Sequence, residues 1–343
     1  MPASPLPGKA LVTGSAGFIG FHLTRLLLDE GWTVLGYDGM TPYYDVTLKR
    51  RRNQMLLQHP NFRVVEAMLE DAESLDNAAD AFEPDIILHL AAQAGVRYSL
   101  EEPKAYIESN VIGTFHVMEV ARRHSVKHLL MASTSSVYGG NEEMPFLETD
   151  KADLPLTIYA ATKKAAEAMG HSYAHLWNLP VTMFRFFTVY GPWGRPDMAL
   201  YKFVDAILNG RPIDLYNNGC LYRDFTYVTD LVRGIRLLID AIPERPPRRV
   251  DVDLGDSLSP VAPFRVVNIG NGEKTSLLDF VAAIEASLGV KAVRNLMPMQ
   301  KGDVEATWAD SSLLSRLTGF RPNTDVGEGV AKFVAWYRDY YGK

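Results

Sequence analysis

The sequence predicts an α/β fold, in which a doubly wound parallel sheet carries helices on both faces and is followed by a smaller C-terminal lobe. Apolar strand patterns alternate with amphipathic helix patterns from residue 9 to about residue 187, as is typical of such a sheet. A glycine-rich turn joins the first strand to the first helix, and after Phe187 the alternation becomes irregular. In chain order, we expect strands at residues 10–13, 33–37, 62–65, 86–90, 128–133 and 181–186.

Glycine and proline mark the boundaries of the two expected units. Four of these residues fall between 191 and 196, and five prolines between 243 and 263 indicate a surface loop. Further helices are expected near 231–241, returning to the sheet, and near 277–288 and 326–340. We therefore predict a flexible tail at 1–8, a sheet domain of 9–187 with about 225–269, and a lobe of 188–224 with 270–343.

Composition excludes several classes of function. The 343 residues, 47% of them hydrophobic, are enough for a large core, and the net charge of −6 with no long basic tract argues against nucleic-acid binding. No apolar run approaches a membrane span and the first residues do not resemble a signal peptide, so we expect a cytoplasmic protein. The histidine pairs 171/175 and 124/128 lack a third ligand, and we expect no metal site.

The turn after the first strand has the spacing of a dinucleotide site. Gly14 would make the turn, Gly17 would let the backbone approach a pyrophosphate, and Gly20 would let the helix pack closely on the sheet. The free N–H groups at the start of that helix, which begins with Phe18 and Ile19, would face the phosphates.

Asp38 ends the second strand about 20 residues beyond the glycines, where a carboxylate takes the ribose hydroxyls of NAD. A carboxylate there favours NAD over NADP, because it would repel a ribose phosphate. The basic run 49–52 tempers this preference, and we interpret it as a solvated helix face.

The ends of the fourth and fifth strands and the next helix carry the candidate chemistry. Small residues, Ala91 and Ala92, follow the fourth strand where a cofactor must pass, while His89 is interpreted as a packed strand residue. Hydroxyl side chains follow the fifth strand, and Tyr159 and Lys163 then share one helix face. A lysine ammonium and a positive nicotinamide nearby would lower the tyrosine pKa toward neutrality and make the phenol a usable base.

These motifs resemble a known family. The three glycines with Tyr159 and Lys163 are similar to those of the extended short-chain dehydrogenases/reductases, and the similarity covers essentially the whole chain. Within that superfamily, the stretch 186–199 resembles the UDP-glucuronate 4-epimerases, with support from 89–97, 223–228 and 262–271. The resemblance implies a Rossmann-type fold, bound NAD, a UDP-sugar substrate and a homodimer formed through helices near 110–124 and 159–175.

The resemblance also assigns roles to residues of this chain. Thr134 would share a hydrogen bond to the sugar O4, Tyr159 would be the base, and Lys163 would bind the nicotinamide ribose and tune Tyr159. The expected cofactor contacts are Gly14, Gly17, Phe18, Ile19, Gly20, Asp38, Leu69, Ala91, Ala92, Asn110, Tyr159 and Lys163. The expected substrate contacts are Thr134, Ser135, Ser136, Thr188, Arg195, Arg223 and Asp303.

Two positions depart from the family pattern. Met68 stands where many relatives carry an aspartate for the adenine, with Leu69, Glu70 and Asp71 following, which puts adenine binding there in question. Gln300 stands where UDP-galactose epimerases tend to have a second phosphate-binding arginine, which weakens a hexose-epimerase interpretation.

Several functions share the first oxidation, and the residues favour epimerisation of UDP-glucuronate. A 4,6-dehydratase usually carries an Asp-Glu pair after the threonine, and UDP-glucuronate decarboxylase tends to carry a glutamate at the second position, where Ser135 and Ser136 stand here. A UDP-hexose 4-epimerase would have little use for Arg195, the candidate to hold the sugar carboxylate, whose alternative is a loop arginine facing solvent. A non-catalytic NAD-binding scaffold would not need Tyr159 and Lys163 in register.

Overall fold

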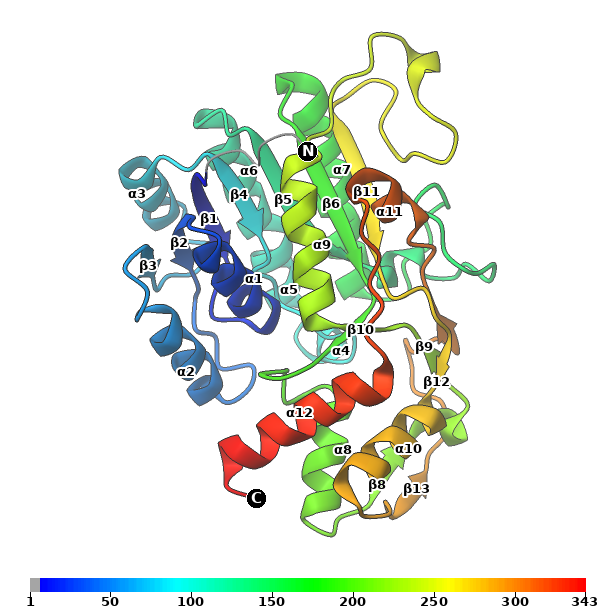
Figure 1. Cartoon of the computed structure of the whole chain (residues 1–343). Coiled ribbons are helices and arrows are strands. Elements are labelled where there is room, and N and C mark those ends of the chain that lie inside the picture. Colours follow the sequence, from blue (N-terminus) through cyan, green and yellow to red (C-terminus); the bar gives the residue numbers. More distant parts are fainter. Residues whose placement is uncertain (1–6) are drawn as a thin grey trace.

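A seven-stranded parallel sheet organises the protein in the computed structural model, which describes residues 7–343 (Figure 1). The strand order is β3-β2-β1-β4-β5-β6-β11, and all neighbours run parallel, with Leu11 paired to Leu35 on one side and to Ile87 on the other. The strands are β1 (Lys9–Thr13), β2 (Thr33–Tyr37), β3 (Phe62–Val65), β4 (Ile86–His89), β5 (His128–Thr134), β6 (Val181–Phe186) and β11 (Phe264–Ile269). The predicted fold class is confirmed.

The sheet reverses its order between β1 and β4, and helices cover both of its faces. On one face, α1 (Phe18–Asp29), α9 (Val228–Asp240) and α11 (Ser312–Thr318) share a buried core with the strands. On the other face lie α3 (Ala72–Phe82), α6 (Thr114–Arg123) and α7 (Ile158–Trp177). Ligands of such sheets bind beyond the carboxyl ends of the strands, where the order reverses.

Short helices connect these elements at the edge of the sheet that faces the lobe. They are α2 (Val46–Leu56), α4 (Tyr98–Glu101), α5 (Pro103–Ile107), the π-helical turn η1 (Glu108–Gly113) and the 3₁₀ turn η2 (Ser135–Tyr138). Among the residues described, no helix is long and apolar enough to cross a membrane.

A smaller group of elements lies beyond this edge, at the bottom of Figure 1. Its core is formed by α8 (Ala199–Leu208), α10 (Leu277–Leu288) and α12 (Val326–Tyr341), with the rings of Phe225 and Phe280 stacked 3.9 Å apart. Short strand pairs connect it to the sheet: β7 (Thr188–Tyr190) with β10 (Phe225–Tyr227), β8 (Ile213–Leu215) with β13 (Arg294–Leu296), and β9 (Tyr222–Arg223) with β12 (Thr275–Ser276) and β14 (Ala306–Thr307). A 3₁₀ turn, η3 (Tyr216–Gly219), follows β8.

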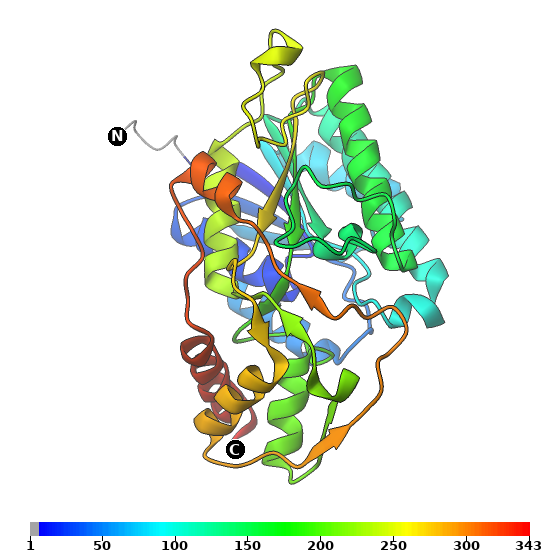
Figure 2. The ribbon, with the colours of Figure 1, turned by 90° about the vertical axis from the view of Figure 1, so that its right-hand side faces the viewer.

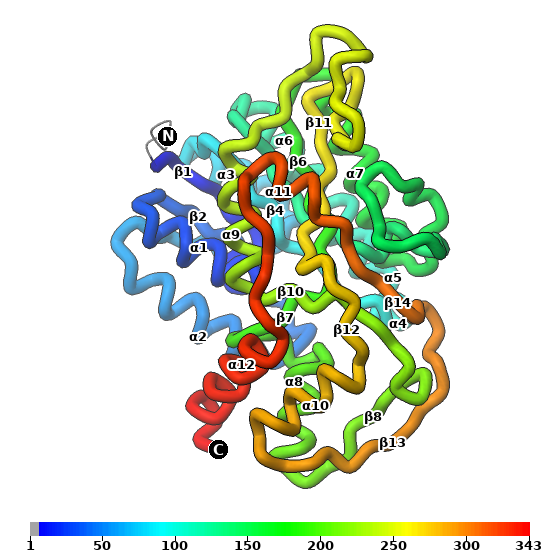
Figure 3. Tube along the Cα trace, turned by 45° about the vertical axis from the view of Figure 1, so that its right-hand side comes forward, coloured from blue at the N-terminus to red at the C-terminus, as the bar shows by residue number. Residues whose placement is uncertain are grey.

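The chain crosses between the two groups more than once. After β13 it runs up the side of the molecule to α11, which packs on the sheet, before returning to α12 (Figure 3). Leu313 and Leu314 of α11 are buried in the core that α1 and α9 share. Residues 312–318, which the sequence analysis assigned to the lobe of 188–224 with 270–343, therefore pack with the sheet and not with the lobe.

Two further sequence expectations concern segments at the surface. The proline-bearing segment 243–263 projects from the molecule, with a 3₁₀ turn at Arg249–Asp251 (Figure 2). The tail expected at 1–8 lies outside the described residues except for Pro7 and Gly8. The Gly8 carbonyl accepts a hydrogen bond from the Thr33 amide (3.1 Å), so Gly8 already belongs to the edge of the sheet and not to a flexible tail.

Candidate active site

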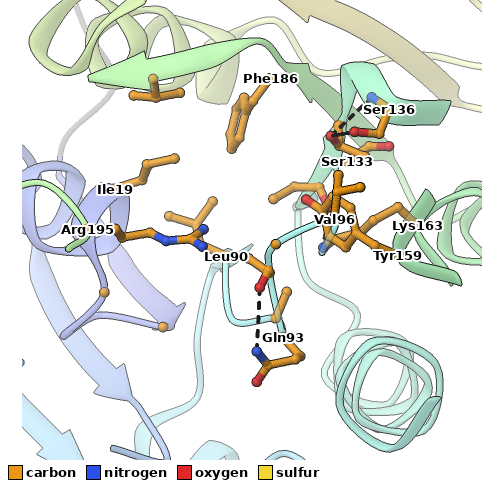
Figure 4. A pocket seen from close by; sticks show the side chains of 18 of the residues that line it. Ile19, Leu90, Gln93, Val96, Ser133, Ser136, Tyr159, Lys163, Phe186 and Arg195 are labelled. Carbon is orange, nitrogen blue, oxygen red and sulfur yellow. Dashed lines mark hydrogen bonds between the residues drawn. The ribbon is translucent and has the colours of Figure 1, made fainter. Parts of the chain in front are cut away.

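A cavity of about 580 Å³ opens at the carboxyl ends of the strands, between the sheet and the lobe. It is lined by residues that follow each strand from β1 to β6, by Arg223 of β9 and by residues in and just before β14. Every predicted site residue except Asn110 contributes to its wall. Figure 4 shows Tyr159 and Lys163 on one side of the cavity and Arg195 reaching in from the opposite side.

Asn110 does not line the cavity, so its predicted contact with the cofactor stays a prediction. It is buried in η1, where its Oδ1 accepts from the Gln93 amide (2.8 Å) and its Nδ2 donates to the Gln93 carbonyl (3.0 Å) and to Thr162 Oγ1 (3.1 Å). Asn110 therefore fixes the loop after β4, from which Gln93 lines the cavity.

The glycine turn has the geometry that its spacing predicts. Gly14 has a positive φ of 73°, and a Cβ there would lie 2.8 Å from the Ala91 amide nitrogen. A Cβ on Gly20 would lie 2.0 Å from the Gly14 carbonyl oxygen, so only glycine lets α1 approach the turn this closely. No side chain caps α1, and its first turn carries no acidic residue. Its N-terminal N–H groups are thus available to an anionic group such as a diphosphate.

Asp38 lies at the end of β2 with a buried carboxylate. Its Oδ2 accepts from the Ala16 amide (3.0 Å), its Oδ1 accepts from the Met40 amide (2.9 Å), and Lys49 Nζ lies 3.9 Å away. The carboxylate is thereby fixed beside the glycine turn, where it would meet the ribose.

The interpretation of residues 49–52 as a solvated helix face is wrong for two of them. Lys49 lines the cavity, and Arg52 is fully buried. Arg52 Nη1 donates to the Ala16 carbonyl (2.9 Å) and to Tyr44 Oη (3.1 Å), and its Nη2 donates to the Trp193 carbonyl (2.5 Å). Oxygen acceptors at these positions permit the burial of a guanidinium, and a run of charges in the sequence does not reveal them.

The end of the cavity next to Asp38 is formed by Met68, Leu69 and Glu70. Met68 is half-exposed, while Leu69 is buried and contacts the backbone at Gly113. Glu70 Oε2 is a buried acceptor without a hydrogen-bond partner among the described residues. The sequence analysis assigned no role to Glu70, although it stands two residues after the missing aspartate.

Thr134, Tyr159 and Lys163 all line the cavity; Figure 4 shows Tyr159 beside Lys163, and the Thr134 side chain lies within hydrogen-bonding reach of Tyr159. Thr134 ends β5, and its Oγ1 accepts from the Ser136 amide (3.2 Å) and so caps η2. Tyr159 stands in the first turn of α7, which Thr157 caps, and Lys163 follows one turn later with its Nζ donating to the Ala132 carbonyl (2.9 Å). A helix cap and a strand carbonyl therefore fix the two functional groups.

The electrostatics of Tyr159 differ from the prediction. Burial raises its pKa, while the hydrogen bond with Thr134 and the positive charge of Arg195 lower it and offset part of the burial effect. Burial lowers the pKa of Lys163 to about 8. The ammonium binds a carbonyl group, and the cation that favours the phenolate from the protein side is Arg195. The expected reduction toward neutrality would still need the charge of a nicotinamide ring.

Arg195 lies in the loop after β7 and points into the cavity, which excludes the alternative of a solvent-facing arginine (Figure 4). Its Nε donates to Asp197 Oδ1 (3.0 Å) and its Nη2 donates to Asp197 Oδ2 (2.5 Å). Burial acts to lower the pKa of Arg195, but the charge and hydrogen bonds of Asp197 outweigh it and raise that pKa. Thr188, Ser135 and Ser136 also line the cavity, and Figure 4 shows Ser136 on the side opposite Arg195.

Arg223 and Asp303 lie at the lobe end of the cavity. Burial and the nearby charge of Arg97 lower the pKa of Arg223, whereas Asp303 raises it. Arg97 Nη2 donates to Asp303 Oδ2 (3.0 Å), and its guanidinium lies 4.4 Å from the centre of the Tyr216 ring. The sequence analysis quoted Arg97 only as part of a motif. Because Arg97 and Asp303 lie far apart in the sequence, nothing in the sequence indicates that their side chains pair.

Comparison with known proteins identifies the family. Residues 10–253 match the NAD dependent epimerase/dehydratase family. The chain belongs to this family. Its central sheet, glycine turn and Tyr-Lys pair are what the resemblance led us to expect. No group of three His, Cys, Asp or Glu side chains that could hold a metal ion occurs within residues 7–343.

Relatives within the epimerase/dehydratase family align over nearly the whole chain. A probable UDP-glucuronate 4-epimerase from Rhizobium meliloti (strain 1021) is 57% identical over 333 residues, covering 97% of this chain and 98% of the relative. UDP-glucuronate 4-epimerase 1 from Arabidopsis thaliana is 43% identical, covering 97% of this chain and 77% of the relative.

The fold is also that of solved members of the family. UDP-glucuronic acid 4-epimerase from Bacillus cereus, in complex with UDP-glucuronic acid and NAD, superposes with a TM-score of 0.84 at 30% identity, covering 97% of this chain and 100% of that chain. MoeE5 in complex with UDP-glucuronic acid and NAD gives a TM-score of 0.78 at 32% identity, with 97% and 100% covered.

Proposed function

We propose that this protein interconverts UDP-glucuronate and UDP-galacturonate by reversible oxidation of the sugar at C4. One arrangement carries the proposal: Tyr159 and Lys163 face Arg195 across a cavity that is also lined by Thr134, the glycine turn and Asp38. The names of the relatives from Rhizobium meliloti and Bacillus cereus support the same activity.

The residues of the cavity fit NAD. The uncapped start of α1 and the close approach that Gly14 and Gly20 permit suit the diphosphate, and Asp38 suits the ribose hydroxyls. Glu70 Oε2, buried without a partner, is placed to accept from the amino group of an adenine that lies over Leu69. The cofactor would accept a hydride from C4 and return it, so that no net oxidation occurs.

The side chains of the protein would supply the proton path and the orientation. Tyr159 takes the proton of O4, Thr134 holds that oxygen, and Lys163, fixed by the Ala132 carbonyl, holds the ribose hydroxyls next to Tyr159. The 4-keto sugar then turns within the cavity between the sheet and the lobe and presents its other face. Tyr159 returns the proton on that side.

The neighbours of Thr134 support epimerisation over elimination or loss of carbon dioxide. Ser135 and Ser136 line the cavity where an acid-base pair would have to stand, and neither can move a proton to or from carbon as a carboxyl group can. Arg195 gives the sugar carboxylate a charged partner, which a UDP-hexose epimerase would not need.

We assign the two ends of the cavity to two parts of the chain. Residues 9–187 with 225–269 would bind NAD, and residues 188–224 with 270–343, apart from α11, would bind the UDP-sugar. Arg223 and Asp303, which line the cavity, would hold the UDP portion, and Arg97 would fix Asp303 through its hydrogen bond.

We also propose a homodimer in the cytoplasm. Large apolar side chains are exposed at Ile112 (42%) and Phe115 (44%) and, on the neighbouring α7, at Leu176 (65%) and Trp177 (47%). Paired helices from two copies would cover such residues, as in the symmetric interfaces common among dimers. Light scattering should give twice the chain mass, and Phe115→Asp should reduce it to one; a monomeric wild-type protein would contradict this.

Product analysis tests the proposed activity. The purified protein is incubated with UDP-glucuronate, without added NAD, and the nucleotide sugars are separated by chromatography. We expect UDP-galacturonate, with bound NAD copurifying and not consumed. UDP-xylose would indicate a decarboxylase, NADH formed in step with product would indicate a dehydrogenase, and no reaction would favour a non-catalytic scaffold.

A further inference from the structure

Arg195 is held by two residues to which the reaction assigns no role. The Asp197 carboxylate accepts hydrogen bonds from Nε (3.0 Å) and Nη2 (2.5 Å) of the Arg195 guanidinium. Tyr43, from the loop after β2, donates its hydroxyl to Asp197 Oδ2 (3.1 Å), and its ring centre lies 5.8 Å from the Arg195 guanidinium carbon. Tyr43, Asp197 and Arg195 thus form a hydrogen-bonded chain that reaches the cavity.

The way Asp197 binds leaves one edge of Arg195 free. A guanidinium has five N–H groups in a planar fork, and Asp197 occupies the edge formed by Nε and Nη2. Within residues 7–343, the hydrogen bonds donated by Arg195 come from Nε and Nη2, and none comes from Nη1. The edge formed by Nη1 and Nη2 therefore remains available for a second carboxylate, in the same two-point geometry.

Tyr43 is itself firmly placed. Its ring packs 4.9 Å from that of Tyr98, and its hydroxyl lies so close to Gly95 that a Cβ there would approach it to 2.6 Å. The neighbouring Tyr44 accepts from the buried Arg52. Burial and the charge of Asp197 raise the pKa of Tyr43 to about 12, so that it stays a donor, while Arg195 and Tyr43 keep the pKa of Asp197 low.

We propose that Tyr43 and Asp197 are positioning residues that fix Arg195, with its free edge toward the cavity, for the carboxylate of a hexuronate sugar. This inference rests on the proposed function. It adds that whether the sugar keeps its carboxylate depends on the orientation of the Arg195 guanidinium as well as on the charge of Arg195.

The chemistry of the intermediate explains why direction matters. A 4-keto hexuronate is a β-keto acid, which loses carbon dioxide when its C5–C6 bond stands perpendicular to the ketone plane, because electrons then flow into an enolate. A guanidinium fixed along one edge can keep the carboxylate close to that plane, whereas an arginine free to rotate would follow the carboxylate out of it.

The test measures two products at once. UDP-glucuronate labelled at C6 is given to the wild-type protein and to Tyr43→Phe and Asp197→Asn, and released carbon dioxide is compared with UDP-galacturonate. We expect the ratio of carbon dioxide to epimer to rise about tenfold in Tyr43→Phe, as for a lost hydrogen bond to a charged group, and further in Asp197→Asn. A purely structural defect would lower both products together and leave the ratio unchanged.

A matched control removes the same kind of contact elsewhere. Tyr337 donates to Asp205 Oδ1 (2.7 Å) on the lobe, outside the cavity, and Tyr337→Phe should keep the wild-type ratio. If the wild-type protein forms UDP-galacturonate and both cavity variants keep its product ratio and KM, the inference is wrong. If the wild-type protein forms none, the proposed function fails. Should Asp197→Asn not fold, Tyr43→Phe, which changes no charge, decides the question.

Discussion

The two sides of the cavity are built in different ways. Tyr159, Lys163 and Thr134 stand on long regular elements, where a helix cap and a strand carbonyl fix them. Arg195, Arg223 and Asp303 stand on loops and short strands. Arg195 and Asp303 are each fixed by a single charged neighbour. Backbone groups and helix geometry therefore fix the proposed catalytic side chains, whereas neighbouring charged side chains fix the proposed substrate-binding residues Arg195 and Asp303.

The largest expected effect falls on the backbone-held side. Tyr159→Phe keeps the ring but removes the proton acceptor, so turnover should fall about 100-fold or more while KM for UDP-glucuronate changes little. Steady-state kinetics with separation of the two UDP-sugars checks this. Near-normal turnover would eliminate Tyr159 as the base, and a loss confined to KM would indicate a structural role.

Arg195→Ala should give the next largest effect, and of a different kind. Loss of a charge-assisted pair should raise KM for UDP-glucuronate about tenfold or more and release UDP-4-keto-pentose after carbon dioxide is lost. Arg195→Lys keeps the charge without the two-point geometry and should lie between wild type and alanine. Unchanged affinity with only UDP-galacturonate as product would contradict this role.

Arg97→Ala tests the other pair on the recognition side. Removing the partner of Asp303 should raise KM about tenfold and leave kcat nearly unchanged, because Arg97 orients Asp303, which we propose binds the UDP portion and not the reacting sugar. Arg248→Ala, which breaks an exposed pair with Asp251 (2.8 Å) on the projecting loop, is the matched control. A fall in kcat without a change in KM would place Arg97 nearer the chemistry than the structure indicates.

The last expected effect is on the stability of the fold and its dependence on pH. All eight histidines precede residue 188, and burial lowers the pKa of His22 and His128 to about 4 and of His89 to about 3, from 6.5. Below pH 6.5 the unfolded chain binds protons that the folded chain does not. The free energy of unfolding should therefore fall as the pH drops from 6.5 toward 4, by at most about 1.4 kcal/mol per pH unit for each histidine.

Urea unfolding between pH 7 and pH 5 measures this dependence. His89→Gln should make it shallower, since the buried His89 bonds Thr13 of β1 and Thr114 of α6, and His59→Gln, at a partly exposed position, is the matched control. A dependence unaltered by His89→Gln would show that this imidazole does not resist protonation.

The same contrast explains what could be predicted from the sequence. The strands at 33–37, 62–65 and 181–186 were placed to the residue, because apolar patterns report burial directly. The glycine turn and the Tyr-Lys pair could also be predicted, because each depends only on residues close together in the sequence. β7, β9 and the other strands of two or three residues were missed, since so short a segment carries no periodicity.

Contacts between distant or irregular segments could not be predicted. The pairing of Arg97 with Asp303 depends on how the lobe folds back, and the burial of Arg52 depends on carbonyl groups at Ala16 and Trp193. Asn110 was assigned to the cofactor, although its side chain binds the backbone at Gln93. Arg195 was identified, but Asp197 and Tyr43 were not, because loop geometry decides which side chains meet.

The buried Arg52 has a further consequence for how the molecule moves. It joins the glycine turn, through the Ala16 carbonyl, to the loop that carries Arg195, through the Trp193 carbonyl. Opening of either segment would remove one acceptor of this buried guanidinium, so the two segments should fluctuate as one cooperative unit. The amides of Gly17 and Gly194, each bonded within its own turn, should then exchange with deuterium at a common rate set by one opening event, and Arg52→Met should let the two rates diverge.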